Sequence, residues 1–278
     1  MIPFTFSYYK PDSIEEAVTL YQQLTAQNKA PCYYSGGTEI ITLGRINKLY
    51  TDAVIDLKGI PEYTSLVEKD EEIILGAGLS LTELAEANVF PLLTESGGRV
   101  ADHSSRGKIT LGGNICGHFI YREAVLALLV SDSKAVIAGP LGVRKAPMMQ
   151  AFQGTLQLGD GEFLLQTITA KRYLHLPHRG VKKTRMDRIG YPLISIAILQ
   201  VDQKLHIAVS GLCDFPFRSP ELENVLNGGA DGETKIADAM EVIPAPVLDN
   251  LEGSADYRKF VFQNTLHDTL GYFAKEVQ

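Results

Sequence analysis

Two pairs of adjacent glycines constrain the fold of this 278-residue chain more than any other feature. The first pair, Gly36-Gly37, follows a predicted strand over 30–34 and is flanked by the hydroxyl side chains of Ser35 and Thr38. Glycine lets a backbone approach a ligand closely, and neighbouring N–H groups can converge on one oxyanion. A lone glycine pair more often marks a tight turn without a ligand, so this motif by itself leaves both interpretations open.

The second pair, Gly112-Gly113, predicts a second glycine turn later in the chain. A hydroxyl side chain, Thr110, again precedes the glycines by two residues, and an amide side chain, Asn114, follows them. The amide can both donate and accept hydrogen bonds, so it can cap a turn or bind a hydroxyl of a ligand. Two such motifs in successive parts of the chain predict one phosphate-bearing ligand between them.

The charge of the chain limits how it can bind phosphate. The formal net charge is −7, from 26 Lys and Arg against 33 Asp and Glu, and there is no long basic stripe. Affinity for a nucleic-acid backbone comes mostly from clusters of Lys and Arg, so we expect no nucleic-acid partner. A phosphate group must then be held by directed backbone amides in a local concavity, because the global field of the protein repels anions.

Strand and helix signals alternate through the first 168 residues and predict an α+β fold there, with a βαβ-like unit in about the first sixty residues. Two capping boxes, Ser13 with Glu16 and Ser80 with Glu83, each precede an apolar helical pattern. The other signals place strands at 30–34, 53–57 and 72–77, helices at 90–99 and 124–130, and a hairpin over 134–147. We expect two lobes, about 1–58 and 59–168.

The residues from 169 onward have a different pattern. Two runs, 194–201 and 204–210, are typical of antiparallel strands joined by the short turn Asp202-Gln203. We therefore expect a small C-terminal domain, 169–278, in which helices accompany an antiparallel sheet. These helices are predicted at 219–226, 235–239 and 255–273.

Cysteine and histidine spacing indicates no metal site. The three cysteines, Cys32, Cys116 and Cys213, are too far apart for a paired metal motif or a disulfide framework, so we expect reduced thiols. The histidines lack ligand spacing. The N-terminus lacks the features of a signal peptide, and no stretch is long enough to cross a membrane, so we expect a cytoplasmic protein without a membrane partner.

Several ordered motifs resemble the FAD-binding medium subunit of the molybdenum hydroxylases, the family of xanthine dehydrogenase and carbon monoxide dehydrogenase. The resemblance covers nearly the full length and is strongest to the separate FAD subunit of bacterial xanthine dehydrogenases. It rests on Pro-x-Ser-x-x-Glu-Ala at 11–17, Gly-Gly-Thr-Glu at 36–39, Gly-Ala-Gly at 76–78, Leu-Gly-Gly-Asn-Ile at 111–115, Gly-Glu-Phe-Leu-Leu at 161–165 and Gly-Ser-Ala-Asp-Tyr-Arg at 253–258. It implies a two-lobed, PCMH-type FAD-binding domain, similar to vanillyl-alcohol oxidase, over 1–168. Residues 169–278 would then form the C-terminal domain of molybdopterin dehydrogenase FAD subunits.

By this resemblance the cofactor is FAD, and two groups of residues hold its diphosphate. The segment 35–39 wraps the diphosphate, with Glu39 near the flavin ring, while Thr110, Gly113 and Asn114 meet the diphosphate and ribityl chain from the other side. No residue is assigned a catalytic or metal-binding role. The predicted cofactor-binding residues are Tyr34, Ser35, Gly36, Gly37, Thr38, Glu39, Ile40, Val100, Thr110, Gly113, Asn114, Glu123, Leu164 and Lys182.

Two of these assignments leave alternatives open. Lys182 aligns with a family lysine that approaches the isoalloxazine, where it would stabilise the anionic reduced ring; Lys183 replaces it if the alignment shifts by one, and a solvated surface lysine is the other interpretation. Glu123 stands where the family commonly has an Asp that binds the ribityl chain. Tyr121 or Arg122 could instead serve a partner or the acceptor nucleotide, or Arg122 could form an exposed ion pair with Glu123.

The resemblance implies one step of an electron relay. A molybdopterin-binding large subunit would oxidise the substrate, a 2Fe-2S small subunit would carry single electrons, and the flavin of this chain would collect them and pass them to NAD. Three scattered cysteines cannot ligate a cluster that needs four, so the clusters must lie on another chain. Two alternatives stay open: a self-sufficient flavin oxidase of the related fold, and an assembly scaffold that has lost FAD.

Overall fold

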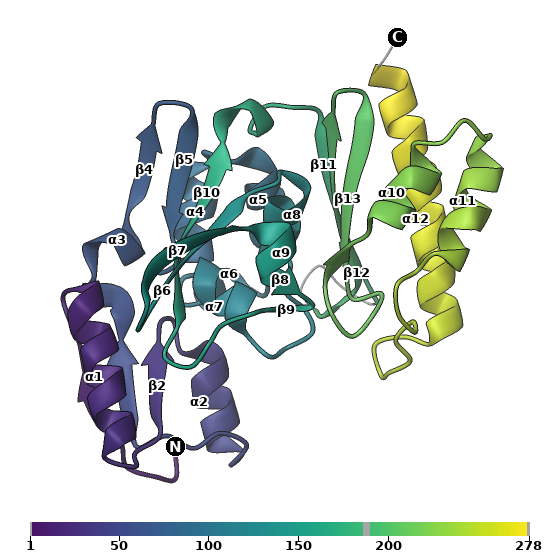
Figure 1. Cartoon of the computed structure of the whole chain (residues 1–278). Coiled ribbons are helices and arrows are strands. Elements are labelled where there is room, and N and C mark those ends of the chain that lie inside the picture. Colours follow the sequence, from purple (N-terminus) through teal and green to yellow (C-terminus); the bar gives the residue numbers. More distant parts are fainter. Residues whose placement is uncertain (1, 186–189, 277–278) are drawn as a thin grey trace. The chain divides into compact units, whose positions relative to one another are not determined.

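The computed structural model describes residues 2–185 and 190–276, and these group into two compact units (Figure 1). Two inner segments, 88–102 and 120–131, belong with the C-terminal half of the chain. Each unit thus combines segments that are separated in the sequence. The predicted division at residue 168 stays a prediction. The first unit consists of the described residues of Met1–Ala87, His103–Phe119 and Asp132–Lys171, and the second of those of Asn88–Asp102, Ile120–Ser131 and Arg172–Gln278.

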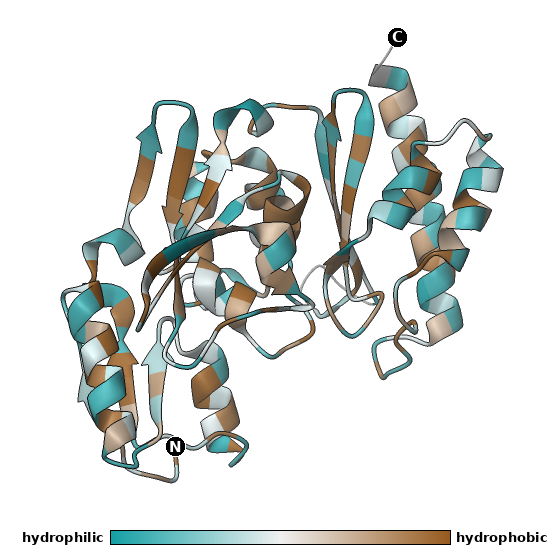
Figure 2. Ribbon diagram, in the orientation of Figure 1, coloured by the Kyte–Doolittle hydropathy of each residue, from teal (hydrophilic) through white to brown (hydrophobic). Residues whose placement is uncertain are grey.

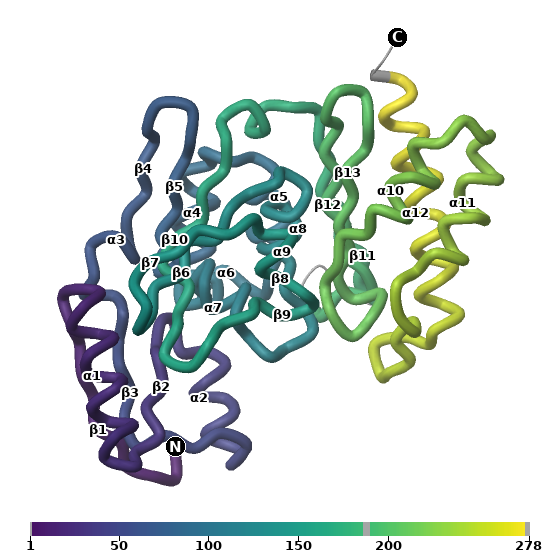
Figure 3. The backbone as a smooth tube through the Cα atoms, viewed as in Figure 1, coloured from purple at the N-terminus to yellow at the C-terminus, as the bar shows by residue number. Residues whose placement is uncertain are grey.

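A three-stranded parallel sheet begins the first unit. Its strands lie in the order β1 (Ser7–Tyr9), β3 (Ala53–Asp56) and β2 (Pro31–Tyr34), and the chain runs between them through α1 (Ile14–Ala26) and α2 (Thr38–Arg45). Parallel neighbours need such crossover connections, so the predicted βαβ arrangement is confirmed. The backbone trace in Figure 3 shows β2 leading into α2.

Of the two predicted capping boxes in this unit, the one at Ser80 is complete and the one at Ser13 is half formed. The Ser13 hydroxyl accepts the N–H of Glu16 at 3.2 Å, but the Glu16 carboxylate accepts the N–H of Asp12 at 3.0 Å instead of that of Ser13. The Ser80 hydroxyl accepts the N–H of Glu83 at 3.1 Å, and the Glu83 carboxylate accepts the N–H of Ser80 at 2.7 Å. These bonds satisfy amides that the first turn of a helix leaves without a partner, and they fix where α1 and α4 (Leu81–Ala87) begin.

An antiparallel five-stranded sheet completes the first unit. Its β6–β7 pair is the predicted hairpin over 134–147. The strand order is β4 (Leu66–Lys69), β5 (Glu72–Gly76), β10 (Phe163–Ala170), β6 (Lys134–Gly139) and β7 (Gly142–Pro147). The smaller elements are η1 (Leu57–Gly59), α3 (Pro61–Thr64), α6 (His103–Arg106), α7 (Leu111–Cys116), α9 (Met148–Ala151), β8 (Phe152–Gln153) and β9 (Thr155–Leu156).

The second unit is built on a four-stranded antiparallel sheet. The predicted turn Asp202-Gln203 joins its middle strands, and both turn residues have positive φ. The strand order is β11 (His178–Thr184), β12 (Pro192–Val201), β13 (Lys204–Ser210) and β14 (Phe217–Arg218). The helices are α5 (Pro91–Gly97), α8 (Ala124–Val130), α10 (Pro220–Leu226), α11 (Gly232–Glu241) and α12 (Ala255–Glu276), and the short helix η2 (Lys171–Tyr173) precedes β11.

Helices pack on both faces of the middle strand β12. Its residues Ile194, Ile196 and Ile198 share one core with Phe262 and Leu266 of α12. The helix α8 also contacts β12 and β13, and all of its residues are buried and apolar, so it is brown in Figure 2. An apolar surface on every side is typical of a helix inside a core. Within residues 2–185 and 190–276, no helix is long and apolar enough to cross a bilayer.

Candidate cofactor-binding site

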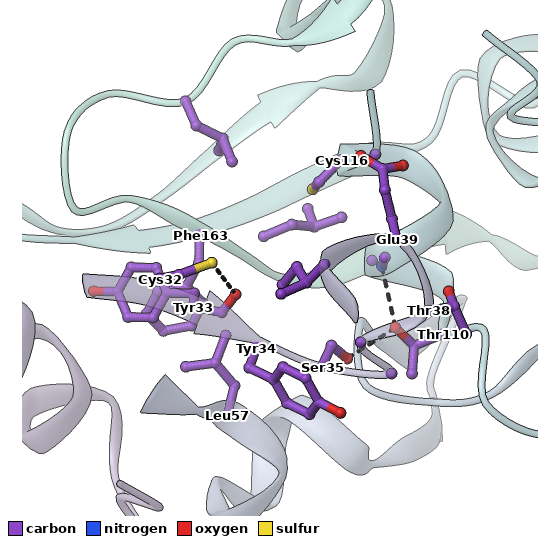
Figure 4. A pocket seen from close by; sticks show the side chains of 18 of the residues that line it. Cys32, Tyr33, Tyr34, Ser35, Thr38, Glu39, Leu57, Thr110, Cys116 and Phe163 are labelled. Carbon is purple, nitrogen blue, oxygen red and sulfur yellow. Dashed lines mark hydrogen bonds between the residues drawn. The ribbon is translucent and has the colours of Figure 1, made fainter. Parts of the chain in front are cut away.

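A pocket of about 240 Å³ lies beside both glycine motifs in the first unit (Figure 4). Its lining consists of residues 32–40, 49, 57, 63, 110, 112, 113, 116–118, 158 and 162–164. The structure thus brings the two glycine motifs to one pocket. Of the predicted cofactor-binding residues, those in the lining are Tyr34, Ser35, Gly36, Gly37, Thr38, Glu39, Ile40, Thr110, Gly113 and Leu164.

The first glycine motif forms the start of α2. Gly37 has a φ of 72°, a left-handed conformation that favours glycine, and it is the N-cap of α2 without a side-chain cap. In the described part of the chain, the backbone N–H groups of residues 36–39 have no protein acceptor. Unpartnered N–H groups at the start of a helix bind anions readily, so this segment is suited to a phosphate group.

The second glycine motif lies in a helix and not in a turn, contrary to the sequence prediction. Thr110 is the N-cap of α7, and its hydroxyl accepts the N–H of Gly113 at 3.1 Å. Local spacing did not reveal this helix because glycine pairs are typical of turns. Asn114 follows within α7 and is buried, and its predicted contact with the ribityl chain stays a prediction.

Direct contacts join the two motifs. The hydroxyls of Ser35 and Thr110 are hydrogen-bonded at 2.8 Å, as the dashed line in Figure 4 shows. A side chain on Gly36 would overlap the backbone carbonyl of Lys108. Glycine is therefore required at position 36 by the close approach of the two backbones, independently of any ligand.

A cluster that the sequence analysis missed lies behind the first motif. The Lys58 ammonium group donates to the carbonyl oxygen of Ser35 at 2.6 Å and to the Asp56 carboxylate at 2.7 Å. The Tyr8 hydroxyl donates to the other oxygen of Asp56 at 2.6 Å. Burial tends to raise the pKa of Asp56, but the hydrogen bonds from Lys58 and Tyr8 outweigh it and hold this pKa below its ordinary value.

Glu39 holds a loop of the backbone. Its carboxylate accepts the N–H of His118 at 2.7 Å and that of Phe119 at 3.3 Å. A side chain on Gly117 would come within 2.7 Å of the same carboxylate. The geometry therefore indicates that Glu39 fixes the loop after α7. Its predicted place near the flavin ring stays a prediction.

Aromatic and aliphatic side chains form another part of the lining. The ring centroids of Tyr33 and Phe163 are 4.8 Å apart. Tyr33 also stacks on Tyr21, with 4.9 Å between the ring centroids. The Tyr33 hydroxyl donates to the carbonyl oxygen of Gly161 at 3.0 Å, and Leu164 is buried beside this group. Such a surface suits a flat apolar ring.

Two of the three cysteines, Cys32 and Cys116, line the pocket, and Cys213 lies in the core of the second unit. Cys32, Cys116 and Cys213 are free, and burial raises the pKa of the Cys32 thiol to about 11. No group of three or more His, Cys, Asp or Glu that could hold a metal ion occurs in the described residues.

The remaining predicted residues, Val100, Glu123 and Lys182, belong to the second unit. The Lys182 ammonium group lies 3.6 Å from the Glu123 carboxylate, and the two side chains are 8% and 3% exposed. Lys182 is thus not a solvated surface lysine. Burial raises the pKa of Glu123, and Lys182 opposes this effect. Arg122 is 3% exposed, so the alternative of an exposed Arg122–Glu123 pair is wrong.

A family comparison shows which cofactor the chain binds. The family described as "FAD binding domain in molybdopterin dehydrogenase" matches residues 4–169. The chain belongs to this family. Its cofactor is therefore FAD, and the unpartnered amides of residues 36–39 fit the diphosphate that FAD carries.

Known proteins similar to this member of the family are chains of dehydrogenases. The medium chain of carbon monoxide dehydrogenase from Hydrogenophaga pseudoflava is 31% identical over 160 residues, which are 56% of this chain and about half, 54%, of that one. The beta subunit of caffeine dehydrogenase from Pseudomonas sp. (strain CBB1) is 24% identical over 250 residues, 86% of this chain and 83% of that one.

The fold of this chain is similar to that of a solved structure. The chain matches one from carbon monoxide dehydrogenase of Hydrogenophaga pseudoflava, in a form that lacks the Mo-pyranopterin moiety of its cofactor. The TM-score is 0.86 at 22% identity, and the match covers 96% of both chains. The predicted α+β, FAD-binding fold class is confirmed.

Proposed function

We propose that this chain is the electron-transfer subunit of a molybdenum hydroxylase such as xanthine dehydrogenase. In this proposal it accepts electrons from the 2Fe-2S clusters of a small subunit, and a molybdopterin-binding large subunit oxidises the substrate. NAD is the proposed final acceptor. The observation that carries the proposal is the convergence of both glycine motifs on one pocket in a chain of the FAD-binding family.

Different described residues are proposed to hold different parts of FAD. The amides of residues 36–39 would hold the diphosphate, and Tyr33 and Leu164 would provide apolar surface for the ring. The hydrogen-bonded pair of Ser35 and Thr110 fixes the two motifs against each other. FAD supplies a group that takes up single electrons and releases a hydride. The chain itself binds and orients this group.

The roles proposed for Val100, Glu123 and Lys182 rest on the sequence resemblance. Lys182 would stabilise the anionic reduced ring, and Glu123 would bind the ribityl chain. A reduction potential measured on the FAD-loaded chain tests the first role, because Lys182→Met should lower the potential. An unchanged potential would contradict it.

The names of the relatives support placing substrate recognition on another subunit. They name carbon monoxide and caffeine, which are chemically unlike each other. A shared FAD subunit for such different substrates is expected if it only carries electrons. Substrate choice in this protein is then also a property of the proposed large subunit.

Two measurements test the proposal. The purified chain, mixed with FAD and passed through a desalting column, should retain flavin absorbance, whereas a matched sample of Gly36→Ala should retain much less. The complex isolated with its native partners should be reduced by a purine and reoxidised by NAD. The isolated chain should not oxidise the purine.

Other results would favour the two alternatives. Flavin that stays attached after denaturation would indicate a self-sufficient oxidase with covalent flavin. A chain that takes up no FAD would indicate an assembly scaffold. A complex that is reduced by purine but reoxidised only by another acceptor would refute the NAD assignment and leave the relay in place.

A further inference from the structure

We propose that Lys58 is a positioning residue for the diphosphate of FAD. It holds the peptide between Ser35 and Gly36 so that the N–H of Gly36 faces the pocket. The inference rests on the proposed FAD site and adds a residue from outside the pocket lining. No sequence motif singles out Lys58, because its role arises only from tertiary contacts.

Lys58 fixes the orientation of the peptide between Ser35 and Gly36. The Lys58 ammonium group donates to the carbonyl oxygen of Ser35 at 2.6 Å. In a trans peptide the C=O and N–H groups point in opposite directions, so this bond directs the N–H of Gly36 away from Lys58. Gly36 lines the pocket, whereas Lys58 lines only a neighbouring hollow that Gly36 also borders. An N–H of Gly36 that is directed away from Lys58 agrees with a place for the diphosphate in the pocket.

The Lys58 side chain is itself held by several contacts. Its ammonium group is fixed by the Asp56 carboxylate at 2.7 Å and lies 4.6 Å from the centroid of the Tyr34 ring. Asp56 is 4% exposed and also accepts the Tyr8 hydroxyl at 2.6 Å and the backbone N–H of Lys58 at 3.0 Å. A flexible lysine with these partners has a defined direction, as a positioning residue requires.

The charges around the pocket indicate that Lys58 positions a backbone group and does not simply attract the diphosphate. Among the described residues that line the pocket there is no Lys or Arg, and the acidic ones are Glu39 and Glu162. The charge of Lys58 is balanced by Asp56 at hydrogen-bond distance, so the pair presents little net charge to a diphosphate. What Lys58 contributes is the direction of a backbone N–H, which forms a charge-assisted hydrogen bond with a phosphate oxygen.

The two explanations predict opposite signs for one substitution. Asp56→Asn removes a negative charge near the diphosphate, so a purely electrostatic role of Lys58 predicts tighter FAD binding. A positioning role predicts weaker binding, because the neutral amide would hold the ammonium group less firmly than the carboxylate does. The sign of the change in Kd distinguishes the two.

The experiment is a titration of the FAD-free full chain with FAD, followed by quenching of flavin fluorescence. We expect Lys58→Met to raise the Kd about tenfold, which corresponds to about 1.4 kcal/mol, and Asp56→Asn to raise it several-fold. Lys134→Met is the matched control: it removes the same charge from an exposed pair with Glu72, 3.3 Å apart, in the same unit. Its Kd should stay within twofold of the wild type.

A second readout separates positioning from a general loss of structure. Lys58→Met should weaken the binding of ADP more than that of adenosine, because only ADP carries phosphate. Tyr8→Phe keeps the charges of the cluster, changes an exposed side chain, and should weaken FAD binding slightly.

An unchanged Kd in Lys58→Met, equal losses for ADP and adenosine, or tighter FAD binding by Asp56→Asn would overturn the inference. A wild-type chain that takes up no FAD would refute the proposed function itself.

Discussion

Replacing Gly36 by alanine tests the close approach of the two glycine motifs. The added methyl group would overlap the carbonyl oxygen of Lys108, so the motifs must move apart. Overpacking a close-packed site costs about 1–3 kcal/mol, and loss of the hydrogen bond between Ser35 and Thr110 costs about 1 kcal/mol. We expect the free energy of unfolding to fall by about 3 kcal/mol and the Kd for FAD to rise at least tenfold.

Urea unfolding and FAD titration measure these two effects, and Gly271→Ala is the matched control. Gly271 lies in α12 with open space around the position of a Cβ. Alanine is favoured over glycine in a helix by about 1 kcal/mol, so this variant should be slightly more stable and bind FAD normally. If Gly36→Ala behaves like Gly271→Ala in both assays, the reasoning is refuted.

Three further substitutions test other contacts. Glu123→Gln leaves Lys182 buried without its counter-charge and should lower the free energy of unfolding by about 3 kcal/mol; a second change, Lys182→Met, should restore most of it in a urea double-mutant cycle, and no recovery would count against the pair. The hydrogen bond from Arg144 lowers the pKa of Glu162 from 4.5 to about 2, so this pair stabilises the fold above about pH 4.5 and loses its effect as the pH falls towards 2. Glu162→Gln should accordingly be less stable than the wild type at neutral pH, with a difference that narrows in melting curves at lower pH; a constant difference would contradict this. Glu39→Ala should speed hydrogen exchange of the N–H groups at residues 118 and 119, and exchange at the wild-type rate would show that Glu39 does not hold the loop.

Local signals in the sequence predicted much of the fold. A capping box such as that of Ser80 and Glu83 involves residues within one helical turn, so spacing alone reveals it. The turn Asp202-Gln203 is equally local, and it joins the two strands that the sequence predicts. Each of these features is determined by a few neighbouring residues.

Features that depend on distant contacts escaped the sequence analysis. Nothing in the neighbourhood of Lys58 shows that its ammonium group reaches the carbonyl of Ser35, 23 positions away. The motif that predicts Glu39 near the flavin ring does not show that its carboxylate also accepts backbone N–H groups of the loop after α7. Alignment and spacing identify residue types at a site, whereas their partners depend on the folded chain.

The interleaving of the two units bears on how the protein is made. The apolar helix α8 has its partner strands β12 and β13 far downstream, so a ribosome releases it well before they exist. At ordinary rates of synthesis this interval lasts several seconds. During that time, of the elements that α8 contacts most, only the upstream helix α5 has been made, so part of this wholly apolar segment stays uncovered and a chaperone is the natural means of shielding it. For the same reason, no single cut in the chain separates one unit from the other, because a chain cut after Lys171 still carries two segments of the second unit.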